Sequence, residues 1–202
     1  ASGATSIADS SGNGTTGAVS GGVTFGTAGA ISGDTNTAAT FNGTSGVINL
    51  GNPTALQLSC GTVEAWVKTT DTDTSDSRTI AIKWMAYGIS LYAGKPYVCD
   101  WNRGGTAVSV FGSTNVADGQ WHHIAMTFES GVANGMRIYV DGQLDTVDMI
   151  TVADQNHDAI IGAGNIPASV GFFNGTLDEV AIYDTAWTAS QIQRRYHAGK
   201  GS

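Results

Sequence analysis

The stretch of the sequence richest in aromatic side chains lies between residues 84 and 103. Alternate side chains of a strand share a face, so Tyr97, Cys99 and Trp101 would point the same way. An aromatic ring beside an amide and a guanidinium suits a sugar, which offers an apolar C–H face and a rim of hydroxyl groups. The alternative is that these rings fill the core of the protein. The predicted ligand-binding residues are Trp101, Asn102 and Arg103, with Tyr87 and Tyr92 behind them.

Oxygen-bearing side chains near the start of the chain suggest a metal site. Asp9 and Asn13 lie in a glycine-rich loop, which can supply carboxylate, amide and backbone oxygens within a few residues. Calcium prefers about six to eight such ligands in a flexible geometry. Far along the chain, regular alternation would place Asp178 on the same strand face as Val180 and Ile182, where a carboxylate must be paired or bound to a metal. Without a metal, Asp9 would form an Asx turn and Asp178 would accept backbone N–H bonds.

The acidic residues do not form the pair that glycoside hydrolysis requires, namely two carboxyl groups about 5 to 9.5 Å apart. Asp178 and Glu179 are neighbours, so their side chains would leave opposite faces of a strand. Glu64 has Trp66, and not an acid, two residues further on. A pair formed by residues distant in sequence is the alternative, but we predict that the chain is not an enzyme.

The histidines and cysteines show no spacing typical of a metal centre. His122 and His123 are adjacent, and neighbours on a strand diverge, so they cannot bind one ion together. His157 stands alone in a polar stretch typical of a loop. Cys60 and Cys99 are either two buried thiols or one disulfide, because the sequence does not give the distance between them.

Charge and composition exclude two classes of partner. The 202 residues include 9 Lys and Arg against 17 Asp and Glu, a net charge of −8 at pH 7. Binding to nucleic acid needs clustered positive charge, so it is not expected. Membrane insertion is not expected either, because no run reaches the ~18 apolar residues of a membrane helix.

The pattern of the whole chain predicts short antiparallel strands around these residues. In residues 62–68, one face would carry Val63, Ala65 and Val67, and the other Glu64, Trp66 and Lys68. Further strands are expected at 80–92, 95–101, 121–128, 136–140, 143–147, 160–162 and 176–183, with a type I′ turn at Asp141-Gly142.

One helix should follow the last strand. Thr188 and Gln191 form a capping-box pattern, Ile192 and Tyr196 are one turn apart, and Gly199 could close the helix in a left-handed conformation. These elements predict an all-β fold: a two-sheet antiparallel jelly-roll sandwich with one short C-terminal helix, in a single domain over residues 1–202.

Six segments resemble, in this order, the laminin G type of concanavalin A-like jelly rolls, near the pentraxins. They are Asp9-Ser10-Ser11-Gly12-Asn13-Gly14, Phe41-Asn42-Gly43, Thr62-Val63-Glu64-Ala65-Trp66-Val67, Asp118-Gly119-Gln120-Trp121-His122-His123-Ile124-Ala125, Ile138-Tyr139-Val140-Asp141-Gly142 and Gly175-Thr176-Leu177-Asp178-Glu179-Val180-Ala181-Ile182-Tyr183. Each motif alone is weak, but six in order are specific. The resemblance implies two antiparallel sheets, the concave one with a groove, in a module that binds glycans or proteins outside cells.

The resemblance also carries expectations about particular residues. It implies a structural calcium (Ca2+) where the N-terminal loop meets the last strand, with Asp9, Asn13 and Asp178 as ligands. It implies that the Trp-His-His stretch is structural, with one imidazole in backbone hydrogen bonds. Relatives usually begin with an apolar strand before the segment matching Ala1-Ser2-Gly3, so its absence predicts an open sheet edge that could pair with another chain.

Two functions follow as hypotheses. The first is a non-catalytic recognition module, on a cell surface, a virion or in the extracellular space, that binds a glycan or another surface ligand. The second is a structural, adhesion or virion-decoration domain that docks to protein partners or to further copies of itself without binding sugar.

Overall fold

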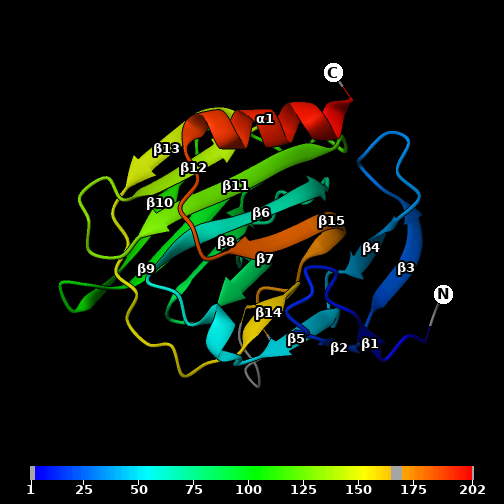
Figure 1. Ribbon diagram of the computed structural model, residues 1–202, viewed down its shortest axis with the longest axis horizontal. Coiled ribbons are helices and arrows are strands. Elements are labelled where there is room, and N and C mark those ends of the chain that lie inside the picture. The colour runs from blue at the N-terminus through cyan, green and yellow to red at the C-terminus, as the bar shows by residue number, and fades with distance from the viewer. Residues whose placement is uncertain (1–2, 165–169, 202) are drawn as a thin grey trace.

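The computed structural model describes residues 3–164 and 170–201, whose strands form two antiparallel sheets packed face to face (Figure 1). Sheet A, the eight-stranded one, contains in spatial order β1 (Ser6–Ile7), β2 (Gly17–Ser20), β5 (Val47–Gly51), β14 (Ala159–Ile161), β7 (Arg78–Lys83), β8 (Tyr87–Tyr92), β9 (Lys95–Arg103) and β10 (Thr106–Phe111). The order alternates between distant parts of the chain, as in a jelly roll. The predicted two-sheet all-β fold is confirmed.

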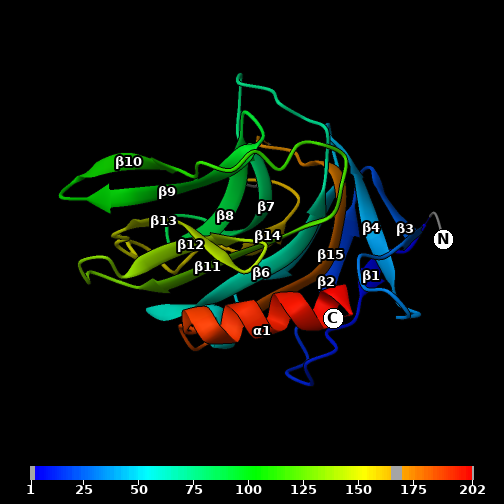
Figure 2. The ribbon, with the colours of Figure 1, turned by 90° about the horizontal axis from the view of Figure 1, so that it is seen from above.

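Sheet B, the seven-stranded one, contains in spatial order β13 (Gln143–Asp148), β12 (Met136–Val140), β11 (His122–Glu129), β6 (Cys60–Lys68), β15 (Asn174–Tyr183), β4 (Thr37–Asn42) and β3 (Val23–Ala28). A 3-10 turn, η1 (Thr54–Leu56), precedes β6, and the helix α1 (Ala189–Lys200) follows β15. Seen from above, α1 lies against the outer face of sheet B, and β7, β8 and β9 lie on the far side (Figure 2). The two sheets therefore have different outer faces, one covered by a helix and one not.

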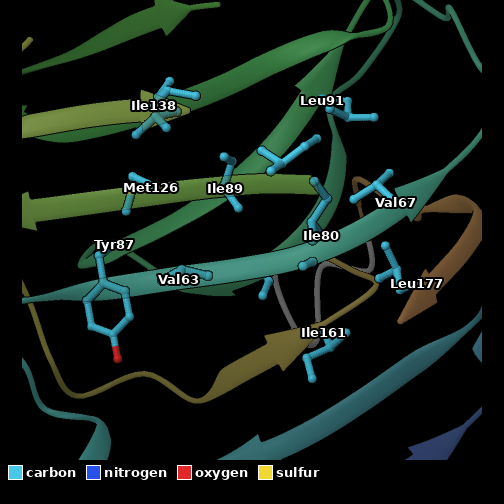
Figure 3. Close-up of a cluster of buried hydrophobic side chains, with 14 of the residues drawn as sticks. Val63, Val67, Ile80, Tyr87, Ile89, Leu91, Met126, Ile138, Ile161 and Leu177 are labelled. Carbon is cyan, nitrogen blue, oxygen red and sulfur yellow. The ribbon is translucent and has the colours of Figure 1, made fainter. Parts of the chain in front are cut away.

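The core lies between the sheets and follows the alternation of the strands. Val63, Ala65 and Val67 of β6 are buried in it, as predicted. Figure 3 shows sheet A side chains such as Ile80 and Ile89 facing those of sheet B. Each such side chain stabilises the fold by about 1.5–3 kcal/mol relative to an exposed one, so this core fixes which side chains must face outward.

The expected strand over residues 80–92 is two strands, β7 and β8, joined by a tight turn. Met85 in that turn has a φ of 57°, and Ala86 N–H donates to the Lys83 carbonyl at 3.0 Å. The sequence pattern did not predict this turn, because residues 83–86 include no glycine, proline or asparagine. The type I′ turn is confirmed, with positive φ at both Asp141 (50°) and Gly142 (76°). Because residues 80–92 form two strands, the residues between β7 and β8, including Trp84, lie at the end of a hairpin.

The predicted face of Asp178 is wrong because β15 contains a β-bulge. Opposite β6, Asp178 pairs with Trp66 but Ala181 pairs with Glu64, so β15 carries one extra residue. That residue is Glu179, with a φ of 47°. Val180 and Ile182 pack on the core, whereas Asp178 lies on the outer face beside Trp66.

Helix α1 begins as predicted and ends two residues later than predicted. Thr188 and Gln191 form both bonds of the capping box, and Ile192 is fully buried. The left-handed closing residue is Gly201, with a φ of 73°, and not Gly199. Gly199 lies within the helix against Trp66, so its small size serves packing.

The structure decides whether Cys60 and Cys99 form a disulfide. Cys60 in β6 and Cys99 in β9 are both free thiols on different sheets, so the disulfide alternative is wrong.

The two-residue β1 forms one edge of sheet A beside β2. Pairing of another chain at this edge stays a prediction.

Candidate functional site

A pocket of about 180 Å³ opens on the outer face of sheet A, the face without a helix. It spans β7, β8 and β9 and the loops beside them. The residues that line it are Asp76, Ser77, Thr79, Ile82, Trp84, Tyr87, Gly88, Ser90, Tyr97, Cys99, Trp101, Gly164 and Val170. Its position follows from the strands, because Thr79 and Ser90 flank core residues and must face outward.

Two tryptophans dominate the pocket. The rings of Trp84, from the β7–β8 turn, and Trp101, from β9, have centroids 4.2 Å apart at an angle of 45°. Both are only partly buried, and they pack on a small apolar cluster that includes Ile82 and Ile160. The cluster holds the rings in place, so they present a fixed apolar surface to solvent.

Hydroxyl groups surround the rings. Ser90 Oγ donates to Thr79 Oγ1 at 3.4 Å on the pocket floor, and the Tyr97 and Ser109 hydroxyls are 3.2 Å apart at one side. Burial raises the pKa of both the Tyr97 phenol and the Cys99 thiol, so both are neutral near pH 7. The polar part of the pocket is therefore mostly uncharged.

Asp76 is the only ionisable carboxyl group among the described residues that line the pocket. Its two oxygens accept backbone N–H bonds from Ser77 and Gly171, each at 2.7 Å. These bonds join the β6–β7 loop to the segment before β15. The described lining holds one carboxylate and not the acid pair that glycoside hydrolysis uses. Rings beside hydroxyls fit the apolar and polar surfaces of a sugar.

The structure separates the predicted ligand-binding residues. Trp101 lines the pocket, and Tyr97 and Cys99 share its face as predicted. Tyr92 lies beside Tyr97, with centroids 6.0 Å apart, and its hydroxyl donates to the Thr74 carbonyl at 2.7 Å. Asn102 is exposed, and its backbone N–H donates to Asp100 at 3.3 Å.

Two of the predicted ligand residues serve the fold. Arg103 joins the sheets: Nε donates to Asp100 at 3.0 Å, Nη1 to Asp148 at 2.8 Å, and Nη2 to the Met149 carbonyl. Tyr87 contributes to the pocket wall, but its ring stacks on Phe128 inside the sandwich with centroids 4.6 Å apart (Figure 3 shows the ring in the core). Burial raises its pKa, and its hydroxyl donates to the Leu56 carbonyl at 2.7 Å.

Sequence reasoning missed Trp84 and Asp76 as parts of the site. Trp84 begins the aromatic-rich stretch, but only the turn between β7 and β8 brings it onto Trp101. Asp76 lies in a polar loop between strands, and no signal in its sequence marks it.

Asp9 and Asp178, two of the predicted calcium ligands, make the hydrogen bonds that were expected of them without a metal. Asp9 accepts from Ser11 N–H at 2.8 Å and Thr15 N–H at 3.1 Å. The Ser11 side chain, followed by these backbone bonds, holds the Asp9 pKa below its usual value. Asp178 accepts from Ala30 N–H at 2.7 Å, and Asn13 N–H donates to Ser11 at 3.3 Å. In the described ranges, no three His, Cys, Asp or Glu side chains gather as ligands of one metal ion. Calcium binding by Asp9, Asn13 and Asp178 stays a prediction.

The outer face of sheet B holds a buried polar network under α1. Glu64 accepts from Tyr183 and Arg195, each at 2.9 Å, and lies 3.0 Å from His123 Nε2. Burial opposes ionisation of Glu64, but the bond to His123 and the charge of Arg195 outweigh it and hold the Glu64 pKa below its usual value. Burial and the Glu64 charge raise the Tyr183 pKa to about 12.

The Trp-His-His stretch is structural, but its imidazoles bond to carboxylates and not to the backbone. His122 lies 2.8 Å from Asp141 and 3.2 Å from Asp118, and His123 bonds to Glu64. Trp66 stacks on Tyr196 of α1 with centroids 5.8 Å apart. Helix α1 therefore covers this network, and a second pocket of about 300 Å³ lies on the same face, lined by residues of β11 and β12 and by the start of α1.

Two of the solved structures with a similar fold are binding domains of toxins. The binding domain of Paraclostridial Mosquitocidal Protein 1 matches with a TM-score of 0.70 and 17% identity, over 95% of this chain and 49% of that one. The binding domain of botulinum neurotoxin DC, in complex with rat synaptotagmin II, gives 0.68 and 12%, over 95% and 48%. This chain therefore spans about half the length of these toxin domains.

A third structure matches along nearly its whole length. Domain 4 of an extracellular arabinanase from Geobacillus stearothermophilus, in complex with arabinotriose, gives a TM-score of 0.61 and 25% identity, over 93% of this chain and 91% of that one. No curated protein sequence matches the chain significantly. Within the described residues, no helix is both long and apolar enough to cross a membrane. The sequence matches a laminin G profile over residues 42–193, so the chain belongs to the concanavalin A-like lectin/glucanases superfamily.

Proposed function

We propose that this chain is a non-catalytic carbohydrate-recognition module that binds a neutral sugar in the pocket of sheet A. The observation that supports this most strongly is the Trp84–Trp101 pair, partly exposed and held on an apolar cluster beside hydroxyl groups. Rings fixed in this way can stack on the C–H face of a sugar without losing much side-chain entropy on binding. The Asp76 carboxylate would accept hydrogen bonds from its hydroxyl groups, and the Tyr97 hydroxyl would accept or donate them.

A neutral ligand is favoured by the charges around the pocket. Its described lining includes no lysine or arginine, so nothing there would neutralise an anionic sugar. Its single carboxylate is already bonded to two backbone N–H groups. The arabinanase domain that matches this fold was solved with arabinotriose, a neutral oligosaccharide, which supports the same class of ligand. We infer a secreted or surface location, because such ligands occur there.

Isothermal titration calorimetry tests the proposal, with arabinotriose, xylotriose and maltotriose as the first neutral ligands. We expect at least one to bind, and both Trp84→Ala and Trp101→Ala to weaken its binding at least tenfold, since a stacked ring contributes on the order of 1–2 kcal/mol. The matched control is Trp121→Ala, because Trp121 is also partly buried but lies before β11 in the other sheet. Melting temperatures check that each variant is folded.

Two results would contradict the proposal. If no sugar on a broad glycan array is retained while the chain forms a stable oligomer, the structural and protein-docking function is the better one. If the purified chain releases new reducing ends from a polysaccharide, the module is catalytic.

A further inference from the structure

We infer that the binding site continues from the tryptophan pocket along β9 to a second aromatic subsite, so that the ligand is a linear oligosaccharide spanning both. This inference rests on the proposed function and names the form of the ligand. The second subsite consists of Tyr92, Tyr97 and Phe111, on β8, β9 and β10. It lies at the edge of sheet A, because β10 is the last strand of that sheet.

The three rings form one compact cluster. Ring centroids are 5.3 Å apart for Tyr97 and Phe111, 5.6 Å for Tyr92 and Phe111, and 6.0 Å for Tyr92 and Tyr97. Phe111 is nevertheless 51% exposed, one of the most exposed large apolar side chains described. A ring that is fixed by its neighbours and open to solvent is available for stacking on a ligand.

Tyr97 connects this cluster to the pocket. It lines the pocket and also contacts both other rings of the cluster. From Tyr97, the same face of β9 continues through Cys99 to Trp101, four residues away. At about 3.3 Å per residue, the two aromatic subsites are on the order of 13 Å apart along the strand. One sugar ring covers one aromatic side chain, so only a chain of linked sugars can contact both ends.

The groups between the two subsites suit a neutral sugar chain better than a protein segment. The hydroxyl groups of Ser109 and Tyr97 lie beside the rings and can bond to sugar hydroxyls. The nearby β6–β7 loop carries Asp71 and Asp73, but Arg78 pairs with both, so their charges are neutralised within the loop.

The loop is also fixed in position relative to both subsites. The Tyr92 hydroxyl donates to the Thr74 carbonyl at 2.7 Å, and Asp76 two residues later lines the pocket. The pocket and the edge cluster therefore share one preformed wall, and a ligand that spans them needs no rearrangement of this loop.

A chain-length series tests the inference. Calorimetry would compare one, two, three and four linked sugars in the arabinose, xylose and glucose series. In the series that binds, we expect the Kd to fall at least tenfold between one and three sugars. Phe111→Ala should raise the Kd for three sugars about tenfold, toward the value for one. Leu144→Ala is the matched control, because Leu144 is 54% exposed but lies on β13 of sheet B, and it should leave the Kd unchanged.

The outcomes separate this inference from the proposed function. If a single sugar binds through Trp84 and Trp101 but longer chains bind no better, the second subsite is refuted and the proposed function stands. If no member of the three series binds, both fail. If sedimentation shows a dimer that Phe111→Ala dissociates, while chain length has no effect, the edge cluster binds a second copy of the chain and the inference is overturned.

Discussion

The outer faces of both sheets carry aromatic and polar side chains, but those of sheet B are buried under α1 and the tryptophans of sheet A are partly exposed. On sheet B, the polar groups of Glu64 and His123 are almost fully buried, and α1 adds Arg195 and Tyr196 over them. On sheet A, Trp84 and Trp101 stay partly exposed beside hydroxyl groups.

The difference lies in what each set of side chains needs for the fold to be stable. A buried carboxylate is stable only with its bonding partners in place, and Glu64 has three of them, so this network serves the fold. The rings on sheet A need no hydrogen-bonding partner for the fold to be stable. Their exposed apolar surface would gain free energy when a ligand covers it. Under the proposed function, the buried charged network is structural and the half-exposed rings form the binding face.

The largest effect should come from breaking the buried network under α1. Glu64→Ala removes the acceptor for Tyr183, His123 and Arg195, and we expect the free energy of unfolding to fall by about 3–5 kcal/mol. Urea denaturation measures this loss. Glu129→Ala, which removes an exposed carboxylate from the neighbouring strand β11, should change stability by less than about 0.5 kcal/mol. Equal stability of the two variants would show that the network does not hold α1.

A smaller effect should follow from crowding the contact between α1 and sheet B. A Cβ on residue 199 would lie 2.5 Å from Cζ2 of Trp66, so Gly199→Ala should destabilise the fold by about 1–3 kcal/mol. Helix propensity alone would favour alanine by about 1 kcal/mol, so the two explanations differ in sign. Ser190→Ala, on the exposed side of the same helix, is the control in thermal denaturation. A more stable Gly199→Ala variant would mean that the helix packs loosely.

The smallest effect should come from the predicted calcium site, where the N-terminal loop with Asp9 would meet Asp178 of β15. Asp9 and Asp178 already accept backbone N–H bonds, so a bound calcium would add only about 1 kcal/mol. We expect excess EDTA to lower the melting temperature by about 2–4 °C, and added calcium, but not magnesium, to restore it. An unchanged melting temperature would remove calcium from the description of this protein.

Much of the fold could be predicted from local patterns, because alternation in β6 and the capping box of α1 depend on neighbours in sequence. The site was only partly predictable. Tyr97 and Trp101 share a face of one strand, which alternation gives directly. The contact between Trp84 and Trp101 depends on a turn without turn-forming residues, and the ion pair of Arg103 depends on Asp148, 45 residues away. Contacts of that kind are decided by packing.

The bulge at Glu179 has a consequence for comparing this chain with its relatives. Because the strand pairs normally on both sides of the bulge, β15 would keep Asp178 outside and Val180 inside if Glu179 were absent. Only the contacts of Glu179 with Asn36 and Arg195 would be lost. A homologue can therefore be one residue shorter at this point without a change of fold, and an alignment that forbids a gap there would assign every following side chain of the strand to the wrong face.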